Sequence, residues 1–536
     1  MLNDAQLAAV NSKSNRIVCL AGAGTGKSTV LLARITKLIE DGADPNSILA
    51  LTFTNAAAFE MKDRFKSSNH KSECPEFRTF HSFCYHLLSM DKAIREKLGY
   101  SQVPSIASAS AEKKIILEAK LQTGIKLSDK LIFEHVTLDE SQARDLYVLL
   151  KAADRLMKQR NLITFDNLCK NVCDLFISND ATVMAYKKQY RYILADEYQD
   201  SDRKQHDFVM SFHDSHIFVV GDALQNLYAF RGTSSEMIKQ LSEDPTWTTI
   251  KLTENYRSTK EICEYANKYS KSYAKESYRI AMTANKVGED VYVSEYFAES
   301  RGSVPESLMS ILVDRISDQP GTSAILVRTN AEVASMQEYL RDNHIPFISK
   351  RSDIHGHNIL SCVLDDNYAI EWLATFLSAE LYSEYIRRDA IKRQSSRPYT
   401  LYEFINEFGS NKDISDCVSR IYQIRKICKD DSSVTAKQRK ILKALGYDSA
   451  VKLDASEIKT LSDMLTKLSE SLESYTETAV NLYVGTIHSV KGLEYDNVYV
   501  VGPRSYSWPL NNEDNHNLFY VAVTRAKTHL SIYFAH

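Results

Sequence analysis

The sequence predicts an α/β fold built from two parallel β-sheets, each interrupted by a helical insertion. Short apolar runs alternate with stretches whose apolar residues recur at helical spacing, which is typical of parallel sheets covered by helices on both faces. At 536 residues the chain is also too long for one hydrophobic core. The pattern occurs twice, with strands expected at 16–21, 47–53, 191–195 and 217–221, and again at 323–329, 482–487, 497–502 and 529–535.

Two polar, helical stretches lie between the expected strands. The first spans residues 92–160 and includes SAEKKIILEAKLQ at 110–122. The second spans residues 353–476, is rich in Lys and Ser, and carries no motif that we can interpret. We therefore expect two α/β domains with one insertion each. The first domain comprises residues 1–91 and 161–278, and the second comprises residues 279–352 and 477–536.

Composition narrows the function classes. The net charge of −3 excludes a protein that binds polyanions over its whole surface, so any nucleic-acid contact must be a local groove. No apolar run is long enough to span a bilayer, and MLNDAQLAAV lacks the basic and apolar regions of a signal peptide. We therefore expect a soluble, cytoplasmic protein without membrane contact.

Nine cysteines with scattered spacing do not indicate a disulfide framework. Cys169 and Cys173 lie one helical turn apart in LCKNVC. Along the sequence, no second pair of Cys or His completes a metal-binding set beside them. Buried free thiols are the expectation.

A glycine-rich loop follows the first expected strand and precedes an expected helix. AGAGTGKST fits the phosphate-binding pattern G-x-x-x-x-G-K-[ST], with Ala21 at the first glycine position. Glycines allow backbone N–H groups to wrap phosphates, Lys27 reaches the outer phosphates, and Ser28 offers a hydroxyl to Mg²⁺. The residues expected to bind the nucleotide here are Ala21, Gly22, Ala23, Gly24, Thr25, Gly26, Lys27, Ser28 and Thr29.

Two adjacent acids follow the strand at 191–195, in ILADEYQDSD. An acid pair after a strand is most often a helix cap. Beside a phosphate loop, however, Asp196 is placed to hold Mg²⁺ together with Ser28, and Glu197 to activate the attacking water. The sequence therefore predicts ATP hydrolysis, with ATP and Mg²⁺ as the bound cofactors.

Gln199 and Asp200 complete the string DEYQD, and with it the sequence resembles the superfamily 1 helicases of the UvrD/Rep/PcrA type, whose usual form is DEFQD. The other motifs of that family occur in its order between residues 2 and 527. They are LNDAQ (2–6), LTFTNAAAFEMKDR (51–64), RTFHSF (78–83), VVGDALQNLYAFRG (219–232), LTENYRST (252–259), YVGTIHSVKGLEYDNVYVVG (483–502) and LFYVAVTRAK (518–527).

The resemblance implies two RecA-like P-loop NTPase domains, 1A and 2A, with insertions 1B and 2B and with ATP between 1A and 2A. Gln6 would read the adenine and Tyr256 would stack on it. Arg257 and Arg525 would contact the γ-phosphate and spread its developing charge. Two further roles follow from the motifs, for Gln225 as the γ-phosphate sensor and Glu494 as a nucleotide contact.

The resemblance also implies a track for single-stranded DNA across both domains. Aromatic side chains bind single strands by stacking on bases, without reading sequence. The expected stacking residues are Phe53, Tyr228 and Phe230, and the expected backbone or base contacts are Thr54, Asn55, His81, Arg231 and His488.

The chain departs from the family at four places. Tyr198 replaces Phe, and Phe230 stands where Trp is usual, which predicts a smaller stack. Thr29 replaces the Arg that packs on the adenine, which predicts looser base selectivity or nucleotide affinity. His516 holds the position of another usual Arg. In addition, Tyr265, Tyr269 and Tyr273 alternate with lysines; a core-facing stripe is favoured over a nucleic-acid face.

Two hypotheses follow. The first is an ATP-dependent 3′-to-5′ DNA helicase or translocase in repair, replication or antiviral defence, acting on single-stranded DNA and on single-strand/duplex junctions. The alternative is a DNA-stimulated ATPase subunit that senses DNA or recruits for a protein partner such as a nuclease, with little unwinding. Small helicases of this family serve beside a nuclease in Gabija-type anti-phage systems, and the length of the chain suits that role.

Overall fold

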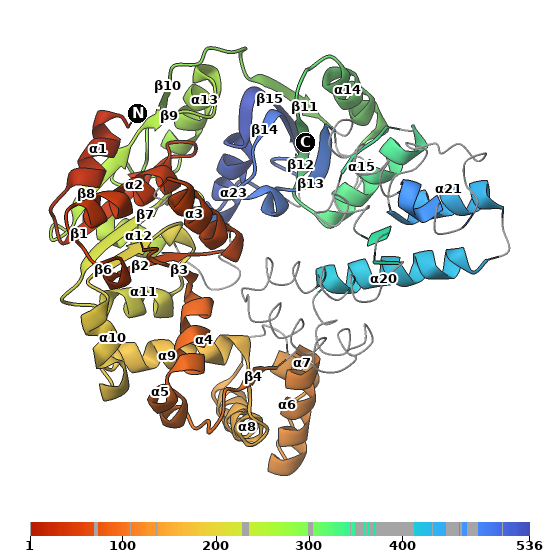
Figure 1. The fold of residues 1–536 in the computed structure, drawn as a ribbon. Helices are drawn as coiled ribbons and strands as arrows, with labels where there is room; N and C mark the ends of the chain where they lie inside the picture. The colour runs from red at the N-terminus through yellow and green to blue at the C-terminus, as the bar shows by residue number, and fades with distance from the viewer. Residues whose placement is uncertain are drawn as a thin grey trace.

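The fold is that of a computed structural model. It describes residues 2–68, 73–107, 109–133, 138–227, 235–297, 304–343, 345–348, 412–430, 433–445, 481–505 and 508–536, with short pieces within 359–373 and 460–468. In these parts of the chain, the two predicted α/β units lie side by side and the helices α4–α9 extend from the first unit (Figure 1).

Parallel strands form the sheet of the first unit, in the order β3-β2-β6-β7-β1-β8 among the described residues. The four strands predicted in this half lie at its centre, and the edge strands β3 and β8 were not predicted. Their bounds are β1 Arg16–Ala21, β2 Ile48–Thr52, β3 Glu76–Thr79, β6 Tyr192–Ala195, β7 His216–Gly221 and β8 Thr248–Leu252.

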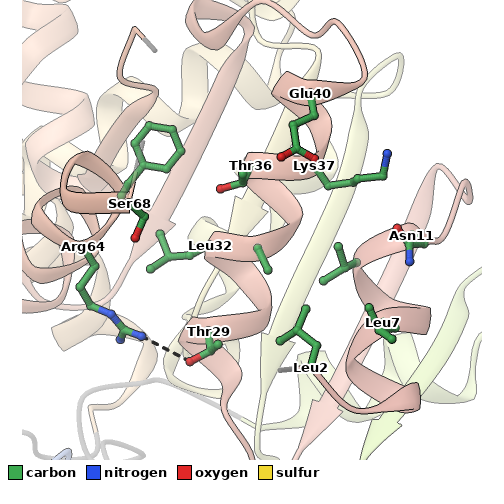
Figure 2. Close-up of a pocket in the computed structure, with 13 residues that line it drawn as sticks. Leu2, Leu7, Asn11, Thr29, Leu32, Thr36, Lys37, Glu40, Arg64 and Ser68 are labelled. Carbon is green, nitrogen blue, oxygen red and sulfur yellow. Dashed lines mark hydrogen bonds between the residues drawn. The ribbon is translucent and has the colours of Figure 1, made fainter. Parts of the chain in front are cut away.

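Residues alternate between the two faces of this sheet, as the period of a strand requires. One face, with Ile17 and Cys19, packs against α1 (Asp4–Asn11), α2 (Lys27–Glu40) and α3 (Asn55–Ser68), which also line a surface groove (Figure 2). The other face, with Val18 and Leu20, packs against α4 (Phe80–Met90), α9 (Phe165–Ile177), α11 (Arg203–Met210) and α12 (Glu236–Glu243).

Helices fill most of the predicted insertion at 92–160, and they have their own small apolar core around Ile115 and Leu149. The helix predicted at 110–122 is confirmed as α6. The elements are α5 Lys92–Lys97, β4 Ser105–Ile106, α6 Ala109–Thr123, α7 Asp129–Phe133, α8 Glu140–Gln159 and β5 Leu162–Ile163, followed after α9 by α10 Met184–Gln189.

The sheet of the second unit is also parallel, in the order β11-β15-β14-β12-β13 among the described residues. All four strands predicted here are present, and only the edge strand β11 was not predicted. The elements are β11 Tyr292–Tyr296, α14 Glu306–Ser317, β12 Ser323–Val327, α15 Asn330–Asp342, β13 Leu482–Thr486, β14 Tyr495–Val501, α23 Glu513–Val523 and β15 Ala526–Ala535.

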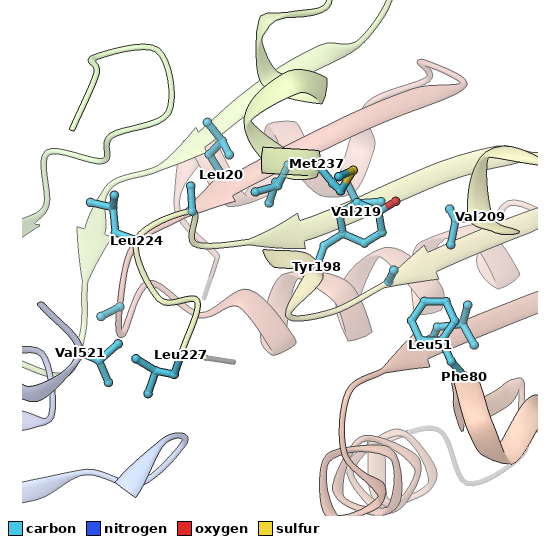
Figure 3. Close-up of a cluster of buried hydrophobic side chains, with 14 of the residues drawn as sticks. Leu20, Leu51, Phe80, Tyr198, Val209, Val219, Leu224, Leu227, Met237 and Val521 are labelled. Carbon is cyan, nitrogen blue, oxygen red and sulfur yellow. The ribbon is translucent and has the colours of Figure 1, made fainter. Parts of the chain in front are cut away.

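One apolar cluster joins the two units. Side chains of the first sheet continue through Leu224 and Leu227 to Val521 of α23 (Figure 3). The same cluster includes Leu326 and Val498 of the second sheet. Helix α13 (Lys260–Lys271), beyond the short strand β9 (Glu254–Asn255), contributes Ile262 and Ala266 to the same cluster. The units are therefore packed against each other and not merely tethered.

The tyrosine stripe belongs to this junction. Tyr265, Tyr269 and Tyr273 pack on the shared cluster. The Tyr269 hydroxyl lies 2.7 Å from Nδ1 of His516, and the Tyr273 ring stacks on the same imidazole at 4.6 Å. The core-facing interpretation is confirmed, and His516, where the family has Arg, forms an aromatic contact between α13 and α23.

The predicted second insertion, 353–476, lies mostly outside the described residues. Its described helices are α20 (Lys412–Cys428) and α21 (Val434–Leu445). The domain boundaries remain predictions. No helix in the described part of the chain is long and apolar enough to cross a membrane.

Candidate nucleotide and DNA site

The phosphate loop connects the carboxyl end of β1 to the first turn of α2. Gly24 and Gly26 have φ of +67° and +84°, a region that costs other residues strain. A Cβ on Gly24 would lie 2.7 Å from Cβ of Arg257, and one on Gly26 would lie 2.9 Å from Nε2 of Gln6. Only glycine fits these two positions, so the loop keeps its backbone N–H groups open to a phosphate.

Helix α1 holds the loop from outside. Asn3 and Gln6 cap the helix reciprocally, and Gln6 is 3% exposed. Its Nε2 donates to the carbonyl of Thr25 at 3.0 Å, while Asn3 Nδ2 donates to the Tyr256 hydroxyl at 2.9 Å. Tyr256 is 56% exposed, and its backbone N–H donates to the carbonyl of Gly24 at 2.9 Å. The predicted adenine residues thus meet at one side of the loop.

The acid pair lies at the end of β6, opposite the loop. Asp196 Oδ2 accepts from Ser28 Oγ at 3.0 Å, and Glu197 Oε1 lies 3.5 Å from Lys27 Nζ. Glu197 has φ +48°, which turns the chain sharply out of the strand and directs the two acids to different partners. Asp196 therefore lies beside Ser28 and Glu197 beside Lys27, and their roles as metal-side and water-side acids stay predictions.

A divalent cation fits beside Asp196. Its carboxylate and the Ser28 hydroxyl are hard oxygen donors, and Asp196 is 5% exposed. Burial, and after it the charge of Glu197, raise the pKa of Asp196 above its ordinary range. Mg²⁺ would remove that cost, because its charge stabilises the ionised carboxylate.

The pKa of Glu197, the predicted water-side acid, is shifted in the opposite direction. Burial alone would raise the pKa of Glu197, but the charges of Lys27 and Lys491 outweigh it and keep that pKa below its ordinary value. Glu197 is therefore ionised while Lys27 is its neighbour.

A chain of side-chain contacts links Glu197 to the second unit. Gln199 Nε2 donates to Glu197 Oε2 at 2.5 Å, and its Oε1 accepts from Asp222 N at 3.0 Å. Gln225 Nε2 donates to Asp222 Oδ2 at 2.8 Å. Gln225 Oε1 accepts from Arg525 Nη2 of the second unit at 3.0 Å. The predicted sensor and the predicted arginine finger are thus in direct contact.

Two arginines from different elements approach the same space. Arg257 Nε pairs with Glu494 at 2.6 Å and its Nη1 donates to Thr524 O at 3.1 Å, while Lys527 lies 3.0 Å from Glu494. Burial, and after it the charge of Arg257, lower the pKa of Arg525 to about 9. Two guanidiniums that repel each other, one buried and one partly buried, favour a bound anion between them, which suits a phosphate.

Comparison with known proteins agrees with this geometry. A family model of the UvrD/REP helicase N-terminal domain matches residues 2–246, and two models of UvrD-like helicase C-terminal domains match residues 250–353 and 481–533. The chain belongs to the UvrD/Rep/PcrA-type helicases.

Curated relatives of this helicase family align over almost the whole chain. A protein named probable DNA helicase II homolog from Mycoplasma capricolum is 26% identical, and the alignment covers 99% of this chain and 84% of that protein. The ATP-dependent DNA helicase PcrA of Staphylococcus epidermidis is 27% identical over 99% of this chain and 83% of its own length. PcrA of Staphylococcus aureus is 26% identical with the same coverage.

The residues expected on the DNA track of this helicase are only partly described. Phe53 and Thr54 follow β2, half-buried, and Thr54 Oγ1 accepts from Ala57 N at the start of α3. His81, in the first turn of α4, stacks on Phe165 at 4.0 Å. His488 lies in the short 3-10 helix Ile487–Val490 after β13, half-buried. The side chain of Asn55, and residues Tyr228, Phe230 and Arg231, lie outside the described residues. The DNA role of the whole set stays a prediction.

Thr29, which replaces the family's arginine, has a guanidinium beside it nonetheless. Arg64 Nη2 of α3 donates to Thr29 Oγ1 at 3.3 Å, across the mouth of the groove between α1, α2 and α3 (Figure 2). The groove has a volume of about 460 Å³. A guanidinium from another helix therefore lies beside the position where the family has its own arginine, and the predicted effect of Thr29 on affinity stays a prediction.

Several residues of this site were missed by sequence reasoning. Asn255 Nδ2 donates to Ala23 O at 2.7 Å, and its Oδ1 accepts from Arg257 N at 2.8 Å, so it joins TENYRS to the loop. Asp200 is fully buried and pairs with Lys491 of the second unit. Both residues lie within the sequence motifs. The partner of Asn255 is 232 residues away and that of Asp200 is 291 residues away, so only the fold brings them together.

Proposed function

We propose that this protein is an ATP-dependent DNA helicase that translocates 3′ to 5′ along single-stranded DNA. The observation that carries the proposal is the contact between Arg525 of the second unit and Gln225 of the first. Groups from both units surround the phosphate loop, so hydrolysis there would change how the units are held together. The names of the aligned relatives, DNA helicase II homolog and PcrA, support DNA as the substrate.

In the proposed cycle, Lys27 exchanges partners. In the structure its ammonium lies 3.5 Å from Glu197, and its charge lowers the pKa of that carboxylate. When Lys27 turns to the outer phosphates of ATP, Glu197 loses the neighbouring charge and its pKa rises. Glu197 then becomes a stronger base for the attacking water, at the stage when it is needed.

In the proposed cycle, Arg257 and Arg525 contact the phosphoryl group that is transferred. Arg257 exchanges Glu494 for phosphate oxygens, and Arg525 supplies the second guanidinium from its position against Gln225. Both spread the charge that develops in the transition state. Ser28 and Asp196 would hold Mg²⁺, whose positive charge would help to neutralise the outer phosphates.

Single-stranded DNA would cross both units at their Phe53, His81 and His488 positions. Closure of the units around ATP would shorten the distance between the two DNA contacts, and release after hydrolysis would lengthen it. Alternate gripping then gives directional stepping and opens a duplex at a single-strand junction. A protein partner such as a nuclease belongs to the second candidate function, in which the chain senses DNA or recruits that partner.

Unwinding of a 3′-tailed duplex, compared with a 5′-tailed one, tests polarity. We expect ATP- and Mg²⁺-dependent unwinding of the 3′-tailed substrate only. Glu197→Gln should lose hydrolysis while keeping ATP binding. Arg525→Ala should lose DNA-stimulated hydrolysis, whereas Arg341→Ala, an exposed arginine on α15 of the same unit, should not.

A different outcome would support the other candidate. Hydrolysis stimulated by single strands without unwinding of either substrate would contradict an independent helicase and favour a sensor subunit that acts with a partner. Normal hydrolysis by Glu197→Gln would refute the assigned base.

A further inference from the structure

Three thiols from two helices meet in the core of the first unit. Cys84 comes from α4, and Cys169 and Cys173 come from successive turns of α9. Their sulfur atoms all lie within 4.8 Å of one another, and Cys169 Sγ lies 3.8 Å from Cys173 Sγ. None of the three is more than 6% exposed. The sequence spacing showed the pair on α9 but not the third thiol, which is 85 residues earlier than Cys169.

The spacing of these sulfurs suits a shared metal ion. Thiolates bound to one tetrahedral zinc at about 2.3 Å lie roughly 3.8 Å apart, and two of the three sulfurs have that separation. Cysteines at i and i+4 occupy one helix face, so α9 can chelate with both. Thiolate sulfur selects zinc or copper(I) over the hard cations that oxygen donors bind.

The position of the three thiols in the chain indicates a structural role for the cluster. At α4 the chain leaves the first sheet for the helical segment 92–160, and at α9 it returns. A bond between Cys84 and the α9 pair would therefore clamp both ends of that segment to the sheet. One turn earlier at the same junction, His81 of α4 stacks on Phe165 of α9 at 4.0 Å.

We propose that Cys84, Cys169 and Cys173 bind one zinc ion, which fixes α4 to α9 at the base of the helical segment. The three thiols supply three of the four donors of a tetrahedral zinc site, and one further donor completes it. Binding releases the thiol protons to solvent as the metal bonds form.

Burial dictates how the site must be tested. Because the thiols are closed to solvent, zinc must enter while the chain folds. Full-length protein is unfolded in denaturant and refolded with zinc sulfate or with EDTA, free metal is removed, and bound zinc is measured by elemental mass spectrometry. We expect stoichiometric zinc only after refolding with zinc, and slower proteolysis within 92–160 than in the EDTA-refolded protein.

Variants separate ligation from packing. Cys84→Ser and the double variant Cys169→Ser/Cys173→Ser should retain no zinc. Cys263→Ser, which removes an equally buried thiol from α13, should retain it in full. Cobalt refolded into the wild-type chain should show intense thiolate charge-transfer bands and tetrahedral visible bands, a measurement that does not depend on any variant folding.

Three results would overturn the proposal. They are wild-type protein that keeps no more zinc than Cys84→Ser, copper in place of zinc at the same thiols, and a disulfide among the three cysteines by peptide mass spectrometry.

Discussion

The buried pair of Asp200 and Lys491 leads to a prediction that can be worked quantitatively. Asp200 is fully buried in the first unit, and Lys491, from the second, is its countercharge. The other carboxylate oxygen of Asp200 has no hydrogen-bond partner among the described residues. Lys491→Met therefore leaves a carboxylate with no compensation, the circumstance in which breaking a buried pair costs most.

Protonation of Asp200 limits that cost. Burial raises its pKa from an ordinary 3.8 to about 6, even though Lys491 acts to lower it. At about pH 8, taking up a proton costs roughly two pKa units, or about 3 kcal/mol, and at about pH 7 about 1.4 kcal/mol. We expect Lys491→Met to lose stability up to these amounts at the two pH values.

The sign of the pH dependence follows from linkage. An acid with a raised folded-state pKa stabilises the protein fully below its unfolded pKa and loses that contribution as pH rises through the folded pKa. In the wild type the loss is complete just above about pH 6. Lys491→Met raises the pKa of Asp200 further, so the stability of the variant falls more steeply across neutral pH than that of the wild type.

Urea unfolding of nucleotide-free protein measures the effect. Trp247 in the first unit and Trp508 in the second, both buried, report the transition by fluorescence. The double variant Asp200→Asn/Lys491→Met, without either charge, should recover most of the loss. An equal loss at both pH values, or a double variant no better than Lys491→Met, would refute the reasoning.

Three further predictions rest on single positions. Gly24→Ala should abolish ATP binding, because its Cβ would lie 2.7 Å from an arginine side chain, whereas Gly42→Ala, with φ +96° and open space, should leave binding by isothermal titration unchanged. Arg34→Met should lower the urea midpoint by an amount equivalent to about 3 kcal/mol or more, because this buried guanidinium bonds three carbonyls at the end of α1; an unchanged midpoint would contradict this. Arg64→Ala should raise KM for ATP several-fold with little change in kcat, and Lys62→Ala on the same helix should not; equal KM values would remove Arg64 from the nucleotide site.

The fold could be predicted where strands are buried on both faces. The predicted strands are all present, because central strands of parallel sheets read as continuous apolar runs. Within the two large sheets, the strands that were missed are β3, β8 and β11, which are edge strands with polar or exposed residues such as Lys251 and Glu295. At an edge the apolar run that identifies a strand is lost.

The candidate site could be predicted as far as motifs are local. Lys27, Ser28, Asp196 and Glu197 meet because the carboxyl ends of β1 and β6 share an edge of the sheet. Contacts that depend on how helices and units pack could not be predicted, such as those of Arg64 with Thr29 and of Lys491 with Asp200. The residues expected to carry the chemistry lie in short sequence motifs, whereas the residues that position them can lie hundreds of positions away in the sequence.

The two sides of the junction between the units differ in how easily they can separate. On the α13 side the contact is apolar and is reinforced by main-chain acceptors and donors, with Ser258 Oγ bonded to Ala526 O at 2.6 Å and Thr259 N to Lys527 O at 3.1 Å.

On the nucleotide side the contacts are charged side chains, Arg525 with Gln225, Arg257 with Glu494 and Lys491 with Asp200. Phosphate oxygens can replace several of these partners at little cost, whereas nothing in the cycle replaces the buried apolar contact. We therefore expect the units to rotate about α13 and α23, so that small exchanges of charged partners at the phosphate loop become larger displacements at the DNA contacts.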